Sequence, residues 1–190
     1  MLQAQALWNS RYRSDKQSWL RQSPRPLLKR FAHHIPKRGR VLDVACGVGT
    51  NGLYLTKRGF RVFHFDVSDV AVRLAKIRFS NAMMRFRGAV LDLETYRLPN
   101  EFFDGIINFC YLERNILKQY SRALKPGGLL VVETFWLPDR TDPKKHYLKP
   151  AELEETFNDF DLLHSELQLR KRGDGSGFRY VKQYVARKPV

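Results

Sequence analysis

The sequence predicts an α/β fold with a mostly parallel sheet of seven strands that ends in an antiparallel hairpin. Between residues 40 and 135, apolar runs typical of strands alternate with segments of helical periodicity, which is the pattern of a parallel sheet with helical crossovers. The run at 103–109 is almost continuously apolar, as expected for a strand that is buried on both faces. Two runs at 161–170 and 178–187 flank a glycine-rich segment and predict the hairpin.

Residues 1–36 are expected to form a helical arm followed by a first helix. In the arm, Trp8 and Tyr12 are four positions apart and therefore lie on one helical face. Ser23 has the chemistry of an N-cap and is followed by Pro24, which suits the first position of a helix. A periodic apolar stripe continues from there until a proline ends the helix.

A glycine-rich turn follows the first predicted strand, residues 40–45. Gly47, Gly49 and Gly52 allow the backbone to bend sharply and to approach a ligand closely. Their spacing suits any adenosine cofactor, including a nicotinamide dinucleotide. Asp43 narrows the choice, because a carboxylate near the end of this strand repels phosphates and attracts an ammonium or sulfonium group. The charge at this position therefore favours S-adenosylmethionine over a dinucleotide.

Acidic residues end the next two predicted strands. The strand at 60–65 ends at Asp66, nineteen residues after Gly47, where an adenosine cofactor needs a carboxylate to accept both ribose hydroxyls. A helix leads from there to the strand at 86–91, which ends at Asp92. Both carboxylates are expected at the carboxyl edge of the sheet, beside the glycine turn.

The central fourth strand should carry its exit residues to the same edge of the sheet, where α/β proteins build their sites. Asn108, Cys110 and Tyr111 are therefore expected to line a cleft there. A helix at 113–124 and a fifth strand at 129–133 follow, and they complete a cofactor-binding core that begins at residue 37 and ends at residue 136.

The remaining residues, 137–190, are expected to shape the acceptor side of the protein. The loop at 137–150 is the longest irregular segment, and such a loop often covers a site, so it is the candidate lid and substrate selector. A short acidic helix to Asn158 and the hairpin follow. With 190 residues, the chain has the length of a single domain.

Four motifs in order resemble those of the class I S-adenosylmethionine-dependent methyltransferases. They are Val-Leu-Asp-Val-Ala-Cys-Gly-Val-Gly-Thr (41–50), Phe-Asp-Val-Ser (65–68), Phe-Asp-Gly-Ile-Ile (103–107) and Leu-Lys-Pro-Gly-Gly (124–128). Three later segments are similar to small methyltransferases of the tellurite-resistance and thiopurine methyltransferase-like kind, namely 133–135, 147–150 and 186–189. The resemblance implies an enzyme with a Rossmann-like three-layer sandwich.

The resemblance also implies a site that binds S-adenosylmethionine and no metal. The expected cofactor-binding residues are Asp43, Ala45, Cys46, Gly47, Gly49, Asp66, Val67, Asp92, Leu93 and Asn108. In the resembled group the N-terminal arm folds over the cofactor cleft, so Tyr12 is a candidate contact to the methionine end. Tyr12 and Tyr111 are the candidate catalytic residues, since a base is needed only when the acceptor must lose a proton. The arm aromatics could equally serve to anchor the arm on the core.

The net charge of +15 is large for this length and is concentrated near the N-terminus. Residues 1–40 contain ten Lys and Arg against one acid, Asp15. Such a face can steer an anionic partner such as RNA, an acidic protein or an anionic small molecule. It can equally be a solvated surface that keeps the protein soluble.

A cytoplasmic location is expected, because no apolar run has the length of a membrane helix or of a secretory signal. The two cysteines, Cys46 and Cys110, have no metal-type spacing and are expected to be reduced.

Transfer of a methyl group to a small-molecule acceptor is the preferred function. An RNA methyltransferase or a non-catalytic nucleic-acid-binding domain that uses the basic residues 1–40 is the alternative, and a nicotinamide oxidoreductase is a further rival. The acceptor and the oligomeric state do not follow from the sequence.

Overall fold

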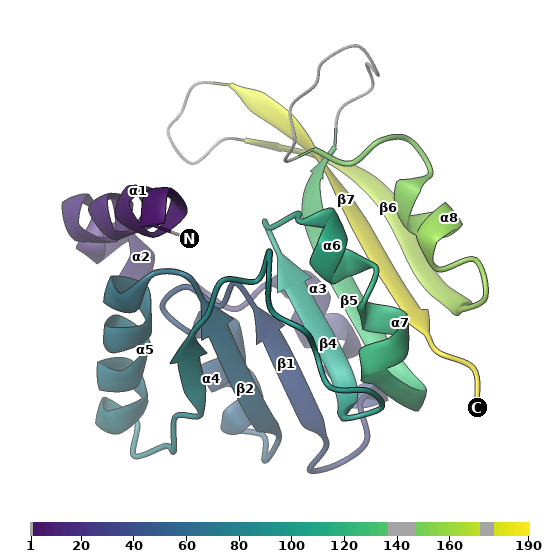
Figure 1. Cartoon of the computed structure of the whole chain (residues 1–190), viewed down its shortest axis with the longest axis horizontal. Helices are drawn as coiled ribbons and strands as arrows, with labels where there is room; N and C mark the ends of the chain where they lie inside the picture. Colours follow the sequence, from purple (N-terminus) through teal and green to yellow (C-terminus); the bar gives the residue numbers. More distant parts are fainter. Residues whose placement is uncertain (1, 137–146, 172–176) are drawn as a thin grey trace.

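A seven-stranded sheet forms the centre of the protein (Figure 1). The computed structural model describes residues 2–136, 147–171 and 177–190. The strands are β1 (Arg40–Val44), β2 (Arg61–Asp66), β3 (Gly88–Val90), β4 (Phe103–Phe109), β5 (Leu124–Trp136), β6 (Asp161–Lys171) and β7 (Phe178–Arg187). The helices are α1 (Leu2–Ser14), α2 (Lys16–Leu20), α3 (Pro26–Phe31), the 3₁₀ turn η1 (Ala32–His34), α4 (Thr50–Thr56), α5 (Asp69–Asn81), α6 (Arg114–Leu117), α7 (Tyr120–Ala123) and α8 (Glu152–Thr156).

The strands follow the order β3-β2-β1-β4-β5-β7-β6. All neighbours from β3 to β5 are parallel, whereas β7 runs antiparallel to both β5 and β6. This arrangement confirms the predicted mostly parallel sheet with a C-terminal antiparallel hairpin. The strand order reverses between β1 and β4, and ligands of such sheets bind outside the carboxyl ends of the strands at this switch point.

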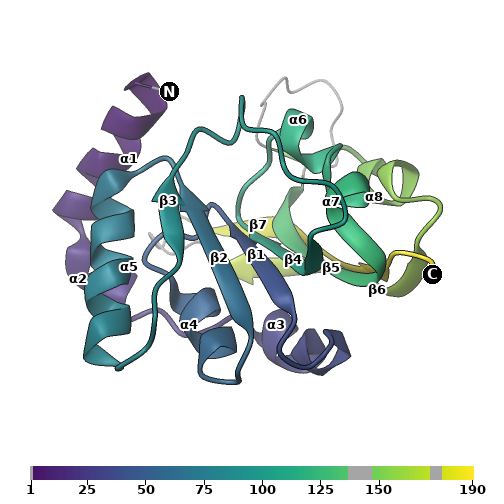
Figure 2. The same cartoon turned by 60° about the horizontal axis from the view of Figure 1, so that its bottom comes forward.

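Helices cover both faces of the sheet and give the predicted three layers (Figure 2). On one face, α6, α7 and α8 close a core that includes Ile106 and Leu130. On the other face, α3 and α4 close a second core that includes Leu28 and Leu55. The arm formed by α1 and α2 packs beside α5, where Tyr12 joins a third apolar cluster. The arm therefore lies against the elements that follow β1 and β2.

The first core helix begins two residues later than predicted. Pro26, not Pro24, occupies its first turn, and Arg25 rather than Ser23 is the N-cap residue. The backbone N–H of Arg25 donates to Asn51 Oδ1 at 3.0 Å, so α4 determines where α3 starts. Both prolines suit the start of a helix, and the sequence pattern alone could not choose between them.

Two strands differ in length from the prediction. β3, an edge strand, pairs with β2 over Gly88–Val90 only. β5 begins at Leu124 rather than at residue 129, since Leu124 pairs with Phe103 before the register shifts. The Lys-Pro-Gly-Gly segment that was expected to close a helix therefore lies inside this irregular strand.

The single helix expected at 113–124 is two short helices, α6 and α7. Gln119 lies between them, and its side chain accepts from the Leu98 N–H at 2.9 Å and donates to the Tyr96 carbonyl at 3.2 Å. The helical segment is thereby tied to the connection between β3 and β4, and it breaks where that tie is made.

The predicted lid loop is described only at its end. Residues 137–146 lie outside the described residues, whereas Leu148 is buried and its N–H donates to the Phe135 carbonyl at 2.9 Å. The last residues of the expected loop are thus anchored on β5. Among the described residues, no helix combines the length and apolar character needed to cross a membrane.

Candidate functional site

The turn between β1 and α4 bends through left-handed backbone conformations. Gly47 has φ 55° and Gly49 has φ 72°, and Ala45 adopts φ 48° although it carries a side chain. A Cβ at Gly47 would lie 2.7 Å from the Tyr12 phenol oxygen. Glycine is therefore required at position 47 both by the backbone and by the close approach of the arm.

Asp66 at the end of β2 is bound to the glycine turn. Its carboxylate accepts from the Gly47 N–H at 2.8 Å and from the Ser68 N–H at 2.9 Å. Burial raises the pKa of Asp66, and the bonds from Ser68 and Gly47 partly oppose this shift. Each carboxylate oxygen can accept more than one hydrogen bond, so both retain capacity for the hydroxyls of a ribose. Val67, the next residue, is half-buried beside it.

Asp43 lies deeper than the sequence suggested, on β1 beneath the start of α4. It is 2% exposed, and its Oδ2 has no hydrogen-bond partner among the described residues. Burial raises the pKa of Asp43 well above its usual range, against the effect of the Gly52 amide. A buried carboxylate without a full set of partners is costly, and a cationic ligand group would stabilise its charged form. This orphan oxygen fits a cofactor with a positive charge.

A second buried titratable group, His64, is the register partner of Asp43 across β1 and β2. Burial lowers the pKa of His64 to about 3, so its ring is neutral at physiological pH. A Cβ at Gly52 would lie 2.6 Å from His64 Nε2 and 2.9 Å from Asp43 Oδ2. Gly52 therefore lets α4 close over this pair, which the sequence did not reveal.

The ends of β3 and β4 complete the cofactor side. Asp92 is half-buried and Leu93 is buried in the core beneath α6 and α7. Asn108 donates from Nδ2 to the Tyr120 hydroxyl at 2.9 Å, and its buried Oδ1 has no partner among the described residues. The Asn108 side chain is thus fixed through its Nδ2 donor, and its Oδ1 is an acceptor that a ligand could use.

Cys110 and Tyr111 point into different surroundings although both follow β4. Cys110, with φ 61°, receives a hydrogen bond from Arg25 Nη2 at 3.1 Å. Tyr111 packs against the core on the side of α6, where burial and, after it, the charge of Glu113 raise its pKa. The structure therefore places Cys110 with the start of α3 and Tyr111 near Asp92.

Arginines gather around a buried carboxylate next to Cys110. Glu133 on β5 is 1% exposed, accepts from Gln183 Nε2 at 2.6 Å and pairs with Arg170 at 3.1 Å. Arg25 Nη1 lies 3.6 Å from the other carboxylate oxygen of Glu133. This Glu133 cluster, comprising Glu133, Arg25, Arg170 and Gln183, was not predicted as a site. The position of Glu133 at the carboxyl end of a buried strand was the available signal.

Hydrogen bonds of Asn9 and the packing of aromatic side chains hold the arm over the glycine turn. Asn9 donates to Asp69 Oδ1 at 2.6 Å and accepts from the Ser68 hydroxyl at 2.7 Å, which ties α1 to the start of α5. Tyr12 is 6% exposed, and its ring centroid lies 4.8 Å from that of Trp19. Tyr12 thus anchors the arm and also reaches the turn.

Neither candidate tyrosine is a ready base. Burial, with a further contribution from Asp66, raises the pKa of Tyr12. Burial, followed by the charge of Glu113, raises the pKa of Tyr111. Both phenols stay protonated at neutral pH, so they can donate hydrogen bonds and pack but do not accept a proton readily.

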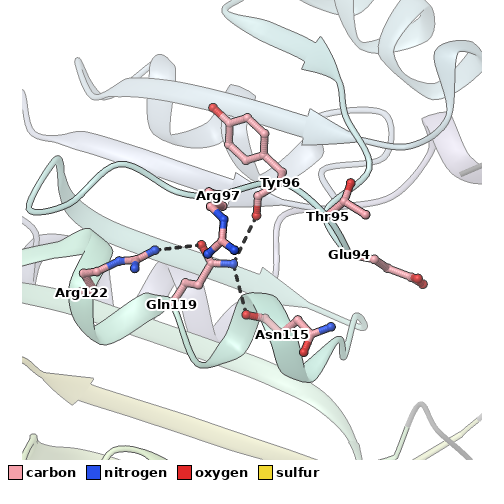
Figure 3. A pocket seen from close by; sticks show the side chains of 7 residues that line it. All are labelled: Glu94, Thr95, Tyr96, Arg97, Asn115, Gln119 and Arg122. Atoms are coloured by element: carbon pink, nitrogen blue, oxygen red, sulfur yellow. Dashed lines mark hydrogen bonds between the residues drawn. The ribbon is translucent and has the colours of Figure 1, made fainter.

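A separate polar hollow of ≈ 470 Å³ lies between the β3–β4 connection and α6 and α7 (Figure 3). The predicted site residues do not line it; its walls are Glu94, Thr95, Tyr96, Arg97, Asn115, Gln119 and Arg122. Gln119 crosses its floor through hydrogen bonds to Tyr96 and Asn115 (Figure 3). Within the described part of the chain, no group of three His, Cys, Asp or Glu residues is placed to hold a metal ion.

Part of the chain is similar in sequence to known proteins. Residues 41–128 match a methyltransferase domain. An uncharacterised methyltransferase of Mycobacterium tuberculosis is 36% identical over 103 residues, which cover 52% of this chain and 51% of that protein. The chain spans about half the length of the mycobacterial relatives that it matches.

Solved structures show the same fold. TehB from Haemophilus influenzae superposes with a TM-score of 0.75 at 20% identity, over 85% of this chain and 61% of TehB. The 1,6-didemethyltoxoflavin-N1-methyltransferase of Burkholderia thailandensis, solved with 1,6-didemethyltoxoflavin and S-adenosylhomocysteine, gives 0.74 at 20% identity, over 98% and 87%. With the glycine turn and the acidic strand ends, these matches show that residues 41–128 are similar to a methyltransferase domain and that the chain has the fold of these solved structures.

Proposed function

We propose that the protein transfers a methyl group from S-adenosylmethionine to a small-molecule acceptor that enters beside Cys110 and Arg25. The observation that carries this proposal is that Tyr12 and Asp66 both lie against Gly47 of the glycine turn. Asn108 is in register with Val44 at the end of β1, and the Glu133 cluster lies at the neighbouring strand ends. The first group of residues suits an adenosine cofactor, and the second suits a polar acceptor.

On the cofactor side, the chain offers acceptors for each polar part of the molecule. Asp66 would hold the ribose hydroxyls, and Asp92 with the Leu93 amide would meet the adenine. Asp43 lies beneath the turn, where the cationic end of the cofactor would stabilise its charged form against the effect of burial. Bound S-adenosylmethionine supplies a methyl group on a positively charged sulfur, which is a good leaving group. The task that remains for the protein is to position the acceptor, which is worth up to about 7–11 kcal/mol in well-aligned reactions.

On the acceptor side, Arg25 and Arg170 offer hydrogen-bond donors that are about one-third exposed, at 33% and 29% of their side-chain surface. Glu133 holds both guanidinium groups in place from below. The burial of Tyr12 against the turn leaves the cofactor side covered by the arm, which favours a compact acceptor. The toxoflavin methyltransferase, which shares the fold, was solved with a small heteroaromatic molecule.

Because both tyrosines remain protonated, neither of them is a ready base at the cleft. The acceptor is therefore expected to be a soft or already deprotonated nucleophile, and Tyr12 and Tyr111 are proposed to position it or the cofactor. The alternative in which RNA is the acceptor is favoured by the high positive charge.

The proposal is tested by calorimetry with S-adenosylmethionine, followed by transfer of radiolabelled methyl to a cell extract. Asp66→Asn should weaken cofactor binding at least tenfold, because the amide can no longer accept from two hydroxyls, whereas Asp15→Asn on the exposed arm should not. Label should appear in the small-molecule fraction. Label that disappears after ribonuclease treatment would replace the small acceptor by RNA, and no cofactor binding at all would refute the proposal.

A further inference from the structure

We propose that the protein binds the phosphate backbone of a nucleic acid on the edge of the sheet opposite the cofactor site. The surface lies at the amino ends of β1, β2 and β3. We call it the basic rim and define it by Lys37, Arg38, Lys57, Arg58, Arg61, Arg85 and Arg87. This inference is independent of the acceptor, since the rim contains none of the residues assigned to methyl transfer.

The positive charge of the protein is confined to one half of the fold. Residues 1–90, which end with β3, contain eighteen Lys and Arg against four acids, a net charge of +14. Residues 91–190 contain sixteen against fifteen, a net charge of +1. The division falls where the chain crosses from the β3 side of the sheet to the β4 side. The net charge therefore belongs to the half of the fold that contains β1, β2 and β3, and seven of the eighteen cations of this half form the basic rim.

Burial of acidic residues makes the charge difference between the two halves of the chain larger at the surface. Of the four acids in residues 1–90, Asp43 and Asp66 are buried beneath the glycine turn, and Asp69 is paired with Arg73 at 2.6 Å. Asp15 on the arm is the remaining one, and it is exposed. The acids that the fold places in this half thus do almost nothing to neutralise its surface cations.

The parallel sheet brings the cations of the basic rim together. Three turns, at 36–39, 57–60 and 82–87, enter β1, β2 and β3, and all three lie at one edge of the sheet (Figure 1). Neighbouring strands are about 4.8 Å apart, so cations from consecutive turns form a short continuous row. Six of the seven rim residues are exposed, and Arg87 is half-buried.

The rim cations have no acidic partners. Among the described residues, none of the seven takes part in an ion pair; the nearby acids Glu101 and Asp104 are instead paired with Lys188 and Lys125. Five of the seven are arginines, whose planar guanidinium groups bind phosphate oxygens through two parallel hydrogen bonds. Unpaired arginines in a row suit a repeating phosphate chain better than a single carboxylate.

The composition of the rim favours a nucleic acid over an anionic membrane. Stable membrane association needs apolar or aromatic side chains that enter the lipid in addition to basic ones. Met83, which is 93% exposed, is the large hydrophobic residue exposed within the three turns. A single methionine gives little apolar anchoring, whereas binding to a phosphate backbone requires only the cations.

The test measures the binding of the whole protein to a labelled single-stranded RNA by fluorescence anisotropy between 50 and 200 mM salt. If the protein contacts about five phosphates, its affinity should fall about 100-fold across this range, from a slope of about −0.7 per phosphate. The triple variant Lys37→Gln, Lys57→Gln, Arg85→Gln removes one cation from each turn. It should weaken RNA binding at least tenfold at 100 mM salt. It should also reduce the slope of the logarithm of the binding constant against the logarithm of the salt concentration by about 2.

The matched control removes three exposed cations from the other half of the fold, Arg97→Gln, Lys118→Gln, Arg122→Gln. It should change RNA binding less than twofold, and both triple variants should bind S-adenosylmethionine as the unmodified protein does. The inference is overturned if the protein does not bind RNA at 50 mM salt, or if the two triple variants lose affinity equally. It is also overturned if vesicles with 30% phosphatidylserine, and not RNA, bind the protein in a manner that depends on the rim.

Discussion

Replacing Gly47 by alanine is expected to force Tyr12 away from the glycine turn. Two costs combine at this position. Alanine at φ 55° pays about 1–2 kcal/mol for a left-handed backbone, and its Cβ would lie 2.7 Å from the Tyr12 phenol oxygen. Overpacking of this kind typically costs about 1–3 kcal/mol more. The free energy of unfolding should therefore fall by about 2–5 kcal/mol.

The overpacking cost comes from the phenol oxygen of Tyr12 and can be removed separately. The next Tyr12 atom is Cζ at 3.6 Å, which is an ordinary contact distance. Tyr12→Phe should thus relieve the collision, and the double variant should recover about 1–3 kcal/mol relative to Gly47→Ala. Gly59→Ala is the control for the backbone alone, since Gly59 has φ 88° and nothing lies within 4 Å of its would-be Cβ.

Urea denaturation of the four proteins in the cycle, with Gly59→Ala beside them, gives the coupling energy between positions 12 and 47. Calorimetry with S-adenosylmethionine on the same proteins shows whether the arm contributes to cofactor binding. Additivity of the two substitutions to within about 0.5 kcal/mol would refute the close approach of Tyr12 to the turn. It would leave the arm as an element that packs only on α5.

Two further predictions concern His64 and Arg25. Since the pKa of His64 is lowered to about 3 in the folded protein, its contribution to stability is present above about pH 6.5 and is lost as the pH falls, at about 1.4 kcal/mol per pH unit. By urea denaturation, the free energy of unfolding should be about 2 kcal/mol lower at pH 5 than at pH 7, and His64→Leu should abolish this difference. If the variant shows the same difference, other groups cause it. Arg25→Gln should raise the KM for the acceptor at least tenfold and leave the cofactor Kd unchanged, and a reversed pattern in kinetics and calorimetry would place Arg25 on the cofactor side.

The sequence predicted that the glycine turn and Asp66 lie together at one edge of the sheet, because the signals for both are local. A glycine turn after a strand and an acid at the end of the next strand must meet at the carboxyl edge of a parallel sheet, and Asp66 does bond to Gly47. The Glu133 cluster could not be predicted in this way. Arg25 and Arg170 reach Glu133 from distant parts of the chain, and only the fold brings them together.

The predicted bounds of α3 and of the helix at 113–124 were wrong for a related reason. Asn51 determines the start of α3, and the contacts of Gln119 with the β3–β4 connection accompany the break between α6 and α7. Both are side-chain contacts between elements, and helical periodicity does not register them. The candidate lid stays a prediction, because residues 137–146 lie outside the described part of the chain.

Ser68 serves two parts of the protein at once. Its amide donates to Asp66, and its hydroxyl donates to Asn9 on the arm. The arm is thereby linked through a single residue to the carboxylate that we propose as the ribose acceptor. If a nucleoside binds at Asp66 and this linkage transmits the effect, any change in the stability of the arm on binding must be matched by an equal change in affinity when the arm is altered.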